Sequence, residues 1–536
     1  MLKGPFYIPL LLPFPLPILK TFRLHFNMSQ KCDTPFHYTD TCIILIRAYL
    51  KLGFIMISRR QFVKNISLGT ASLVILGCGG GKNKGGSSIG ATPPSSSTSG
   101  TNNPLVIPPL IDTRNTTTDL WVRKSQTSIL ANTVTNTYSY NTATEALGLL
   151  GPTLLMENTM TSSVNFINEL DVATTAHQHG LHVSGSNDGG PQSRILPGQS
   201  RTNVLEIDQP AGTHWYHPHP HGKTGEQVIN GLAGLIIIQD QNEINTLPNL
   251  PRDYGVNDFP VIIQDKTFNA DGTVQYDSAK NYGKRGYLGE NILVNGKIEP
   301  TVSTPTGWVR FRILNGSNAR FYERDDSLSL SNNQAFYVIA SDGGLLEAPV
   351  QTTSLPIGPG ERYEIMVELT ASQSVNLRAG KRSILKITAD LSGIDNSTAN
   401  LPHVLASIPS TLNQGQAISR EFVLGGDMTI NGKKMKMAVI NEAVTLGTTE
   451  VWYIHGKGAR HTFHVHGCSF LVIDRDGANI PAWEKGWKDT VIVSGKRPVR
   501  VLVKFNQVAD RNSPYMYHCH MLEHEDMGMM GQFTVM

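Results

Sequence analysis

Paired histidines are the feature of this chain best suited to chemistry. Two histidines stand one residue apart five times, among 17 histidines in 536 residues. The pairs are His177-Gln178-His179, His217-Pro218-His219, His219-Pro220-His221, His464-Val465-His466 and His518-Cys519-His520. Residues i and i+2 of a strand point to the same face, so each pair aims two imidazoles at one point. The pattern predicts metal binding, and we expect copper, because imidazoles together with a thiolate suit that ion.

Cys519 separates the two histidines of the last pair. By the same alternation its thiol points to the opposite face of the strand, toward a different metal. We therefore expect two metal sites that a single short stretch of backbone connects.

The chain is long enough for about three or four domains, and its 40% hydrophobic and 7% aromatic content suits globular cores. Its net charge of +3 comes from the N-terminus, because residues 1–77 hold nine Lys and Arg against Asp33 and Asp40. The remaining chain has 37 basic and 41 acidic residues, a net charge of −4. Nothing in this balance favours nucleic acid as a partner.

The N-terminus carries the signals of an exported protein. Residues 58–64, Ser-Arg-Arg-Gln-Phe-Val-Lys, resemble a twin-arginine export signal, and an apolar stretch over 66–76 follows. Cys78 stands in a context that resembles a lipoprotein cleavage site, so we expect a signal over 56–77 and an acylated Cys78. These features predict a periplasmic or outer-envelope protein whose link to the membrane is its lipid anchor. A short membrane anchor is the alternative, although the stretch is shorter than the ~20 residues that span a bilayer.

Residues 1–55 do not fit in front of such a signal. They mix Pro-broken apolar runs with scattered charges, and Met56 lies two residues before Ser58. Our interpretation is that translation begins at Met56 and that residues 1–55 are a gene-model artefact.

Beyond the signal, the composition predicts a flexible linker over 78–104 and then an all-β body. Residues 79–103 are almost wholly Gly, Ser, Thr, Asn, Pro and Lys. Short β-branched runs separated by Gly, Pro and Asn-Gly turns follow, with few amphipathic helices. No disulfide framework is expected, because Cys468 has no evident partner and is interpreted as a small buried hydrophobe.

A repeat predicts three β-sandwiches. Pro197-Gly198, Pro359-Gly360 and Ser494-Gly495 each lead into a half-apolar strand, over 204–207, 365–369 and 501–505. We expect domains over 105–243, 244–402 and 403–536. No His or Cys lies between His221 and His403, so the middle domain is expected to bind no metal.

From about residue 105 onward the chain resembles the multicopper oxidases, which have three cupredoxin-like Greek-key β-sandwich domains. Four windows carry the resemblance together: His177-Gln-His179-Gly, His217-Pro-His219-Pro-His221-Gly, His461-Thr-Phe-His464-Val-His466-Gly, and residues 518–529 from His518 to Met529.

The resemblance implies four copper ions in two kinds of site. His461, Cys519 and His524 would bind the type 1 copper, with Met529 as its axial ligand. His177 and His464 would bind the type 2 copper. The type 3 pair would be held by His179, His217, His219, His466, His518 and His520. His221 matches no ligand and is interpreted as a residue that orients one.

Two acidic residues occupy positions where the family delivers protons to the cluster. They are Asp188 and Glu525, and oxygen reduction needs such donors. The alternatives are a turn residue for Asp188, within Asn-Asp-Gly-Gly, and a solvated acid for Glu525.

The implied reaction is four one-electron oxidations of a reductant coupled to reduction of dioxygen to water. Electrons would pass from Cys519 to His518 and His520. Five methionines near the type 1 loop favour Cu(I) as substrate, unless they only fill the core: Met516, Met521, Met527, Met529 and Met530.

Other functions stay open at this point. A laccase-like enzyme would oxidise phenols or other aromatic reductants instead of Cu(I). A copper-free scaffold of the cell envelope, resembling the division-associated relatives, would lack ligands that are all present here. A copper nitrite reductase would not need paired histidines.

Overall fold

The computed structural model describes residues 103–391, 395–396, 401–409, 418–495 and 497–536. Residues 1–55, the expected signal over 56–77, Cys78 and nearly all of the expected linker lie outside these residues. Within them, no helix is long and apolar enough to cross a membrane.

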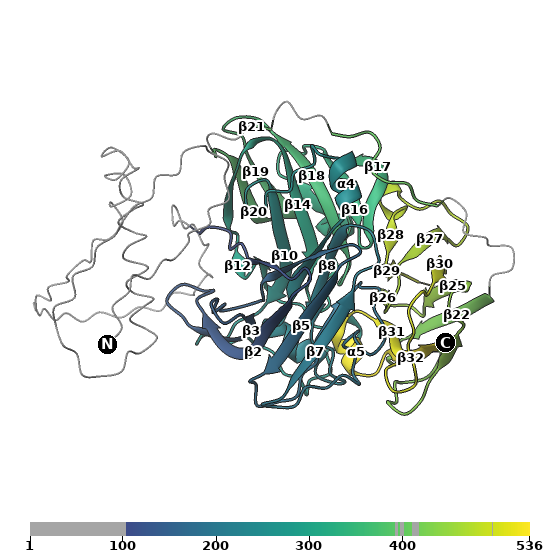
Figure 1. The fold of residues 1–536 in the computed structure, drawn as a ribbon. Coiled ribbons are helices and arrows are strands. Elements are labelled where there is room, and N and C mark those ends of the chain that lie inside the picture. Colours follow the sequence, from purple (N-terminus) through teal and green to yellow (C-terminus); the bar gives the residue numbers. More distant parts are fainter. Residues whose placement is uncertain (1–102, 392–394, 397–400, 410–417, 496) are drawn as a thin grey trace, which may run out of the picture. The chain divides into compact units, whose positions relative to one another are not determined.

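The described residues confirm the predicted all-β fold of three sandwiches (Figure 1). The first sandwich packs a five-stranded sheet, β1–β4–β9–β8–β6, on a four-stranded sheet, β3–β2–β5–β7. Its strands are β1 (Leu110–Asp112), β2 (Thr117–Thr127), β3 (Thr135–Asn141), β4 (Thr153–Glu157), β5 (Thr161–Asn168), β6 (His177–His179), β7 (Ser200–Glu206), β8 (Gly212–His217) and β9 (Gly234–Gln239).

The middle sandwich packs an eight-stranded sheet on the four-stranded sheet β13–β20–β19–β15. The larger sheet has the order β12–β11–β10–β14–β18–β16–β17, with β21 paired to β14. The strands are β10 (Asp258–Lys266), β11 (Asn291–Val294), β12 (Lys297–Ile298), β13 (Thr301–Thr304), β14 (Thr306–Asn315), β15 (Leu328–Leu330), β16 (Phe336–Ser341), β17 (Gly344–Thr352), β18 (Arg362–Leu369), β19 (Ser374–Ala379), β20 (Arg382–Ala389) and β21 (Asp395–Asn396).

The third sandwich packs a six-stranded sheet, β23–β22–β25–β30–β27–β28, on the five-stranded sheet β24–β32–β31–β26–β29. The strands are β22 (Ile418–Gly425), β23 (Thr429–Ile430), β24 (Glu442–Val444), β25 (Thr449–Gly456), β26 (His461–Val465), β27 (Phe470–Arg475), β28 (Trp487–Lys488), β29 (Thr490–Val493), β30 (Val499–Lys504), β31 (Tyr515–Cys519) and β32 (Met530–Val535).

Helices are short and connect strands. They are α3 (Thr224–Ile229), α4 (Gln241–Thr246), α5 (Leu522–Asp526) and the 3₁₀ turns η1 (Gly283–Arg285), η2 (Arg324–Asp326) and η4 (Ala482–Glu484). Asp526 of α5 accepts the backbone N–H groups of Thr224 and Gly225 at 2.8 and 2.9 Å, so α5 of the third sandwich is joined to α3 of the first.

The sequence repeat corresponds to a repeated arrangement of three strands. In each sandwich two strands pair in parallel and the second pairs antiparallel with a third: β2, β5 and β7; β10, β14 and β18; β22, β25 and β30. Gly198, Gly360 and Gly495, which precede the third strands, have φ of +74°, +85° and +67°. Such a turn favours glycine, which explains why the repeat is visible in the sequence.

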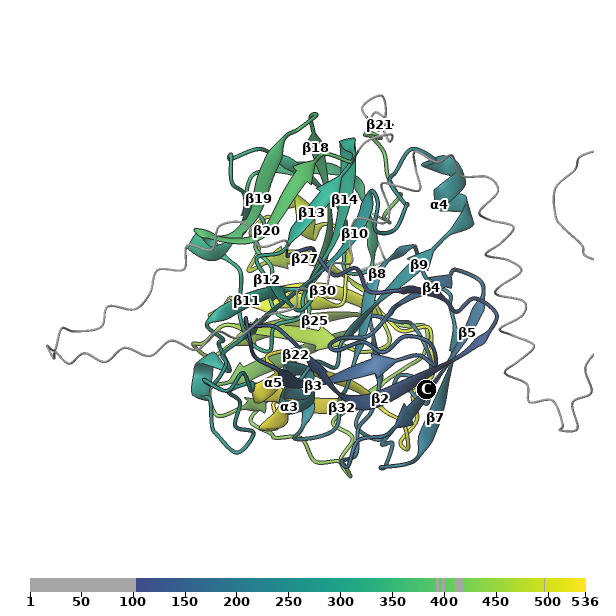
Figure 2. The same cartoon turned by 90° about the vertical axis from the view of Figure 1, so that its left-hand side faces the viewer.

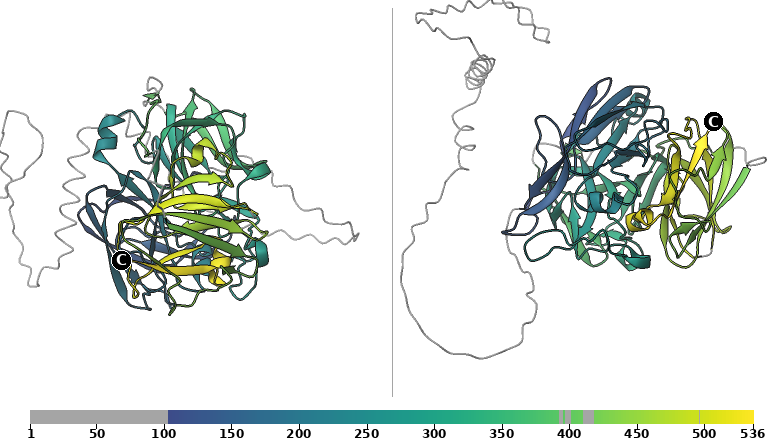
Figure 3. Two further views of the ribbon diagram at one scale, coloured as in Figure 1. Left: turned by 90° about the vertical axis from the view of Figure 1, so that its right-hand side faces the viewer. Right: turned by 90° about the horizontal axis from the view of Figure 1, so that it is seen from below.

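Each sandwich has its own apolar core, formed where the strands alternate buried and exposed residues. Strand β5 alternates almost perfectly, and Phe166 from it packs in the first core. Phe311 lies in the middle core and Trp452 in the third. Figure 2 shows the blue strands β2, β3, β5 and β7 of the first sandwich, and Figure 3 shows the blue first and yellow third sandwiches from below.

Candidate metal centre

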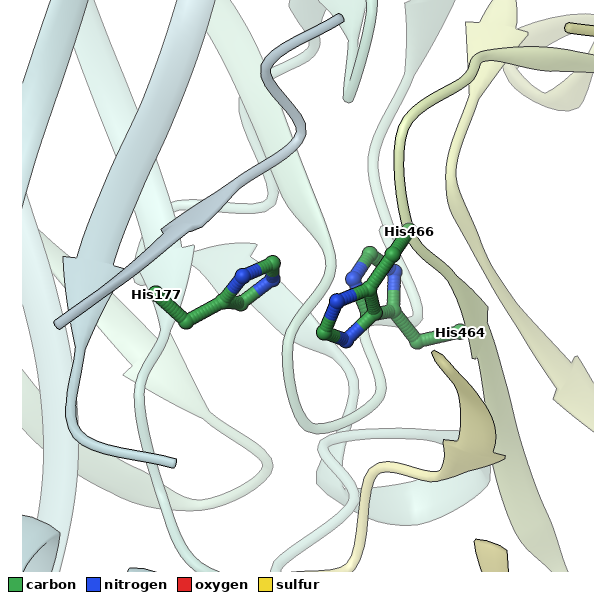
Figure 4. A group of neighbouring side chains, drawn as sticks. All are labelled: His177, His464 and His466. Atoms are coloured by element: carbon green, nitrogen blue, oxygen red, sulfur yellow. The ribbon is translucent and has the colours of Figure 1, made fainter. Parts of the chain in front are cut away.

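Eight paired histidines from the two ends of the described chain converge between the first and third sandwiches. We call them the histidine cluster, and all are buried: His177, His179, His217, His219, His464, His466, His518 and His520. The ring of His177 stacks on that of His466 with centroids 3.8 Å apart, and His179 stacks on His464 at 3.7 Å. Figure 4 shows His177 approaching His464 and His466 from the opposite side.

Strand pairing places these side chains. His177 of β6 lies opposite His217 of β8, and His464 of β26 lies opposite His518 of β31. Directly opposite residues of an antiparallel pair share a face. Each outer sandwich thus presents one set of imidazoles, and the two sets meet.

Hydrogen bonds fix how several rings are turned. His177 donates from Nδ1 to the carbonyl of Asp188 at 2.8 Å, and His464 donates from Nδ1 to the carbonyl of Asp489 at 2.9 Å. His466 donates from Nδ1 to the Asp188 carboxylate at 2.8 Å. The Nε2 atoms of these rings, with their lone pairs, therefore face inward.

The arrangement of the inward nitrogens suits coordination of a metal better than hydrogen bonding between the rings. Nε2 of His177, Nε2 of His464 and both ring nitrogens of His520 are buried without a hydrogen-bond partner in the described structure. Nε2 of His518 lies 3.2 Å from Nε2 of His466 and 3.3 Å from Nε2 of His219. Buried polar atoms are rarely left unpaired, so converging lone pairs of this kind are typical of a metal site.

Burial favours the neutral form of six of these imidazoles. It lowers the pKa of His464 to about 4 and those of His179, His217, His219, His466 and His520 well below the ordinary value. Repulsion between neighbouring rings adds to the effect in these residues. A neutral imidazole keeps the lone pair that coordinates copper.

A second group of donors lies on the other face of the same sheet. We call it the Cys519 group: His461, Cys519 and His524. Cys519 Sγ lies 3.4 Å from Nδ1 of His461 and 3.6 Å from Nδ1 of His524, and the two Nδ1 atoms are 3.3 Å apart. Phe463 pairs with Cys519 and shares a face with His461, so these side chains lie opposite to His464 and His518, as the alternation predicts.

Met529 lies beside the Cys519 group through its main chain. Its N–H donates to the carbonyl of His524 at 3.0 Å, and its carbonyl accepts from the N–H of Cys519 at 3.1 Å. The side chain is buried in the same core cluster as Cys519. Burial raises the pKa of the Cys519 thiol to about 12, so binding of a metal would release its proton.

A segment of the middle sandwich covers His524. Nε2 of His524 donates to the carbonyl of Gly283 at 3.2 Å. We call residues 276–287 the covering segment. It is attached to Glu523, which accepts the Tyr287 N–H at 2.9 Å and the Tyr276 hydroxyl at 3.2 Å. The sequence did not indicate this contact, because the segment carries no metal-ligand pattern.

Both predicted proton donors lie against the histidine cluster. Asp188 is buried, and its carboxylate also lies 3.4 Å from Nδ1 of His177. The two oxygens of Glu525 lie 3.2 Å from Nδ1 of His219 and of His518, and neither accepts a hydrogen bond in the described structure. Glu525 is fully buried, so the interpretation of it as a solvated acid is wrong. Asp188 directly follows the turn over 185–187 and is also a neighbour of two histidines.

Asp489 is a site residue that the sequence analysis missed. Its carboxylate lies 3.0 Å from Nε2 of His179, whose other ring nitrogen lies 3.4 Å from Nε2 of His217. Burial alone would raise the pKa of Asp489, but Arg362 and His179 hold it well below its ordinary value. The available signal was an acid placed directly before the apolar strand β29.

The interpretation of His221 is wrong. It is exposed and lines a surface cavity with Tyr138 and Met437, so it orients no member of the cluster. Cys468 is a buried free cysteine in the third core, as interpreted from the sequence. All twelve predicted ligands lie in the two groups or beside them, but their binding of copper remains a prediction.

Comparison with known proteins places these groups in context. Residues 122–243 and 407–536 each match the family described as "Multicopper oxidase". The chain is 38% identical over 425 residues to multicopper oxidase mco of Staphylococcus haemolyticus, covering 78% of this chain and 88% of that protein. It is also 34% identical over 504 residues to the cell division protein FtsP of Yersinia pestis, covering 89% and 98%. The crystal structure of a multi-copper oxidase from Pediococcus acidilactici has a TM-score of 0.74 and 34% identity, covering 82% and 92%.

Proposed function

Since the chain belongs to the multicopper oxidase family, we propose that it couples one-electron oxidation of a small reductant to reduction of dioxygen to water, using four copper ions. The observation that carries the proposal is the placement of two donor groups on opposite faces of one strand. Cys519 faces His461 and His524, while His518, its neighbour on β31, faces His466 and His219.

The donors divide into a mixed site and an all-imidazole site. His461, Cys519 and His524, with Met529, would hold the type 1 copper. His177 and His464 would hold type 2, and His179, His217, His219, His466, His518 and His520 would hold the type 3 pair. Bound there, copper would supply one-electron redox chemistry and open positions for dioxygen.

The chain's own residues connect and supply the two groups. Cys519 is covalently continuous with His518 and His520, so backbone and side chains of three residues join one group to the other. Asp188 and Glu525 hold carboxylates against four of the cluster histidines, where they would deliver the protons that oxygen reduction consumes.

The reductant that this geometry favours is small, and we propose Cu(I) ahead of a phenol. The Cys519 group is buried, and the covering segment occupies the edge of His524 that a flat aromatic substrate would approach. The methionines give weaker support. Met516, Met521, Met529 and Met530 are buried in core clusters, as expected of core filling, while Met527 is half-buried.

A copper-free scaffold is the second candidate, because FtsP relatives match the chain over most of its length. The test is the copper content of the purified protein after loading. Four copper ions per chain with a blue type 1 absorption support the oxidase, whereas a copper content near zero supports the scaffold. Comparing oxygen uptake with Cu(I) and with a phenol then separates the two substrate classes.

The place of action is also part of the proposal. A twin-arginine signal over 56–77 and a lipid on Cys78 would put the enzyme in the periplasm or outer envelope. Mass spectrometry of the mature N-terminus tests this, and an unmodified chain that retains residues 56–77 would contradict it.

A further inference from the structure

The middle sandwich holds none of the predicted ligands, yet one of its arginines lies behind the histidine cluster. Arg362 is the first residue of β18 and is fully buried. Its Nη1 and Nη2 atoms donate to the two carboxylate oxygens of Asp489 at 2.7 and 2.6 Å. A bidentate arginine fixes the plane of a carboxylate as well as its position.

Asp489 in turn holds His179. The Asp489 oxygen that accepts from Arg362 Nη1 lies 3.0 Å from Nε2 of His179. Because an ionised carboxylate only accepts, His179 must donate from Nε2 and keep its lone pair on Nδ1. His177, His464 and His466 are turned the other way, donating from Nδ1 to Asp188 or Asp489. Among the eight cluster histidines, His179 is the one whose Nε2 is bound by a carboxylate in the described structure.

Arg362 is itself held from several directions. It donates to the backbone carbonyls of Thr213 at 3.1 Å, Gly360 at 3.2 Å and Asp342 at 2.9 Å. Thr213 lies on β8, the strand that ends at His217, so the guanidinium contacts all three sandwiches. Its position is thus fixed independently of Asp489.

Two glycines leave room for this arrangement. A Cβ on Gly180, directly after His179, would lie 2.7 Å from the Asp489 carboxylate and 2.8 Å from Nη2 of Arg362. A Cβ on Gly360, in the turn before Arg362, would lie 2.9 Å from the ring of His520. Both glycines have positive φ. The backbone therefore accommodates the contact of the middle sandwich with the cluster at two separate places.

We propose that Arg362 is a positioning residue of the histidine cluster, which acts through Asp489 to set the tautomer and orientation of His179. The inference rests on the proposed copper oxidase. It assigns the middle sandwich a part in assembling the copper cluster, although that sandwich supplies no ligand. Partners behind a metal-bound histidine commonly fix its tautomer and ring orientation in this way.

The test compares Arg362→Gln and Arg362→Lys with Arg312→Gln. Arg312 is a matched control, because it is another buried arginine of the middle sandwich and forms a bidentate pair with Asp258 at 2.8 and 2.7 Å. It contacts no cluster histidine or Asp489 in the described structure. Lysine keeps the charge of Arg362 but cannot reproduce its two parallel hydrogen bonds.

Two readouts do not depend on turnover. In a copper titration, total bound copper reports all sites and the blue absorption reports the type 1 ion alone. Arg362→Gln should bind cluster copper about 10–100-fold more weakly while its blue absorption stays unchanged. Nitrogen NMR of histidine-labelled, copper-free protein should show His179 losing its single Nε2–H tautomer. Arg362→Lys should lie between Gln and wild type, and Arg312→Gln should lower thermal stability without changing the copper ratio.

Full cluster copper and an unchanged His179 tautomer in Arg362→Gln would overturn the proposal. So would an equal loss of cluster copper in Arg312→Gln, since that would indicate general loosening. If Arg362→Gln does not fold, Arg362→Lys serves as the test. An unchanged His179 tautomer and an unchanged ratio of cluster copper to type 1 copper in that variant would overturn the proposal. A wild-type protein that binds no copper refutes the proposed oxidase, while the tautomer measurement still tests the link from Arg362 to His179.

Discussion

Under the proposed function, electron entry depends on Cys519. Its sulfur is the single thiol within 3.6 Å of both His461 and His524 Nδ1 atoms in the described structure. Cys519→Ser replaces a soft thiolate with a hydroxyl that binds copper poorly, so blue absorption and oxygen uptake should both disappear. The measurements are the visible spectrum and an oxygen electrode with each reductant.

Cys468→Ser is the control for that change. Cys468 is equally buried and free and lies in the same core, but in the described structure it is not among the hydrogen-bonded atoms of the Cys519 group. Its substitution should cost about 1–3 kcal/mol of stability and leave the colour intact. Colour that survives in Cys519→Ser would contradict the assignment of this sulfur.

Glu525 should affect oxygen reduction and leave electron entry unchanged. Both of its oxygens face Nδ1 atoms of cluster histidines, while its neighbour His524 belongs to the Cys519 group. Glu525→Gln keeps the size of the side chain but removes the carboxyl group that would donate a proton. Reoxidation by dioxygen should therefore slow by roughly 10²–10⁴-fold. Stopped-flow bleaching of the blue band without oxygen should proceed at the wild-type rate.

Asp526→Asn is the comparison for Glu525→Gln. Asp526 accepts backbone N–H groups of α3, and the variant should loosen the α3–α5 contact without slowing reoxidation. Equal slowing in both variants would indicate a structural effect and argue against proton delivery by Glu525.

The sequence was sufficient for the residues that follow a local pattern and insufficient for those that do not. The alternation of strands places His518 and Cys519 on opposite faces whatever the rest of the fold is. Asp489 and His179 are 310 residues apart, and Arg362 is 127 residues from Asp489. No spacing rule connects such residues, because their contact arises only when three sandwiches pack together.

At the scale of elements, the same parallel-then-antiparallel group of three strands occurs in every sandwich. The turn glycines could be recognised in the sequence because a positive φ restricts the residue type. The covering segment could not be recognised in the sequence, since Gly283 and Tyr287 contact His524 and Glu523 through backbone groups that any sequence supplies.

The covering segment should control which reductants reach the Cys519 group. Replacing residues 278–285 by a short Gly-Ser turn removes the Gly283 carbonyl from His524 and opens its Nε2 edge. We expect kcat/KM for a bulky phenol to rise relative to that for Cu(I), with the blue absorption unchanged. Steady-state oxygen uptake with both reductants measures the ratio.

A charge control separates access from electrostatics. Lys284 and Arg285 are exposed, so the double alanine variant removes their charge and keeps the segment in place. This variant should leave the ratio of kcat/KM for the phenol to kcat/KM for Cu(I) close to that of the wild type. An unchanged ratio in the shortened variant would show that the segment does not limit access.

At the scale of the whole molecule, the histidine cluster depends on packing between sandwiches. The first supplies His177, His179, His217 and His219, and the third supplies His464, His466, His518 and His520. Neither set is complete alone, and the middle sandwich holds Arg362 against the junction. The arrangement explains why residues so distant in the sequence must fold into one unit before copper can bind.

Copper should therefore stabilise the junction of the first and third sandwiches more than either sandwich itself. A ligand that binds only the folded state stabilises it by about 2.7 kcal/mol at 100 times its Kd, and residues of both sandwiches would hold the ions of the histidine cluster. Removing copper with a chelator should lower Tm and increase hydrogen exchange in β8 and β26 more than in β14 of the middle core. Restoring copper should reverse both changes, whereas adding the same buffer without copper should not. An unchanged Tm, or equal exchange gains in all three strands, would mean that packing holds the junction without the metal.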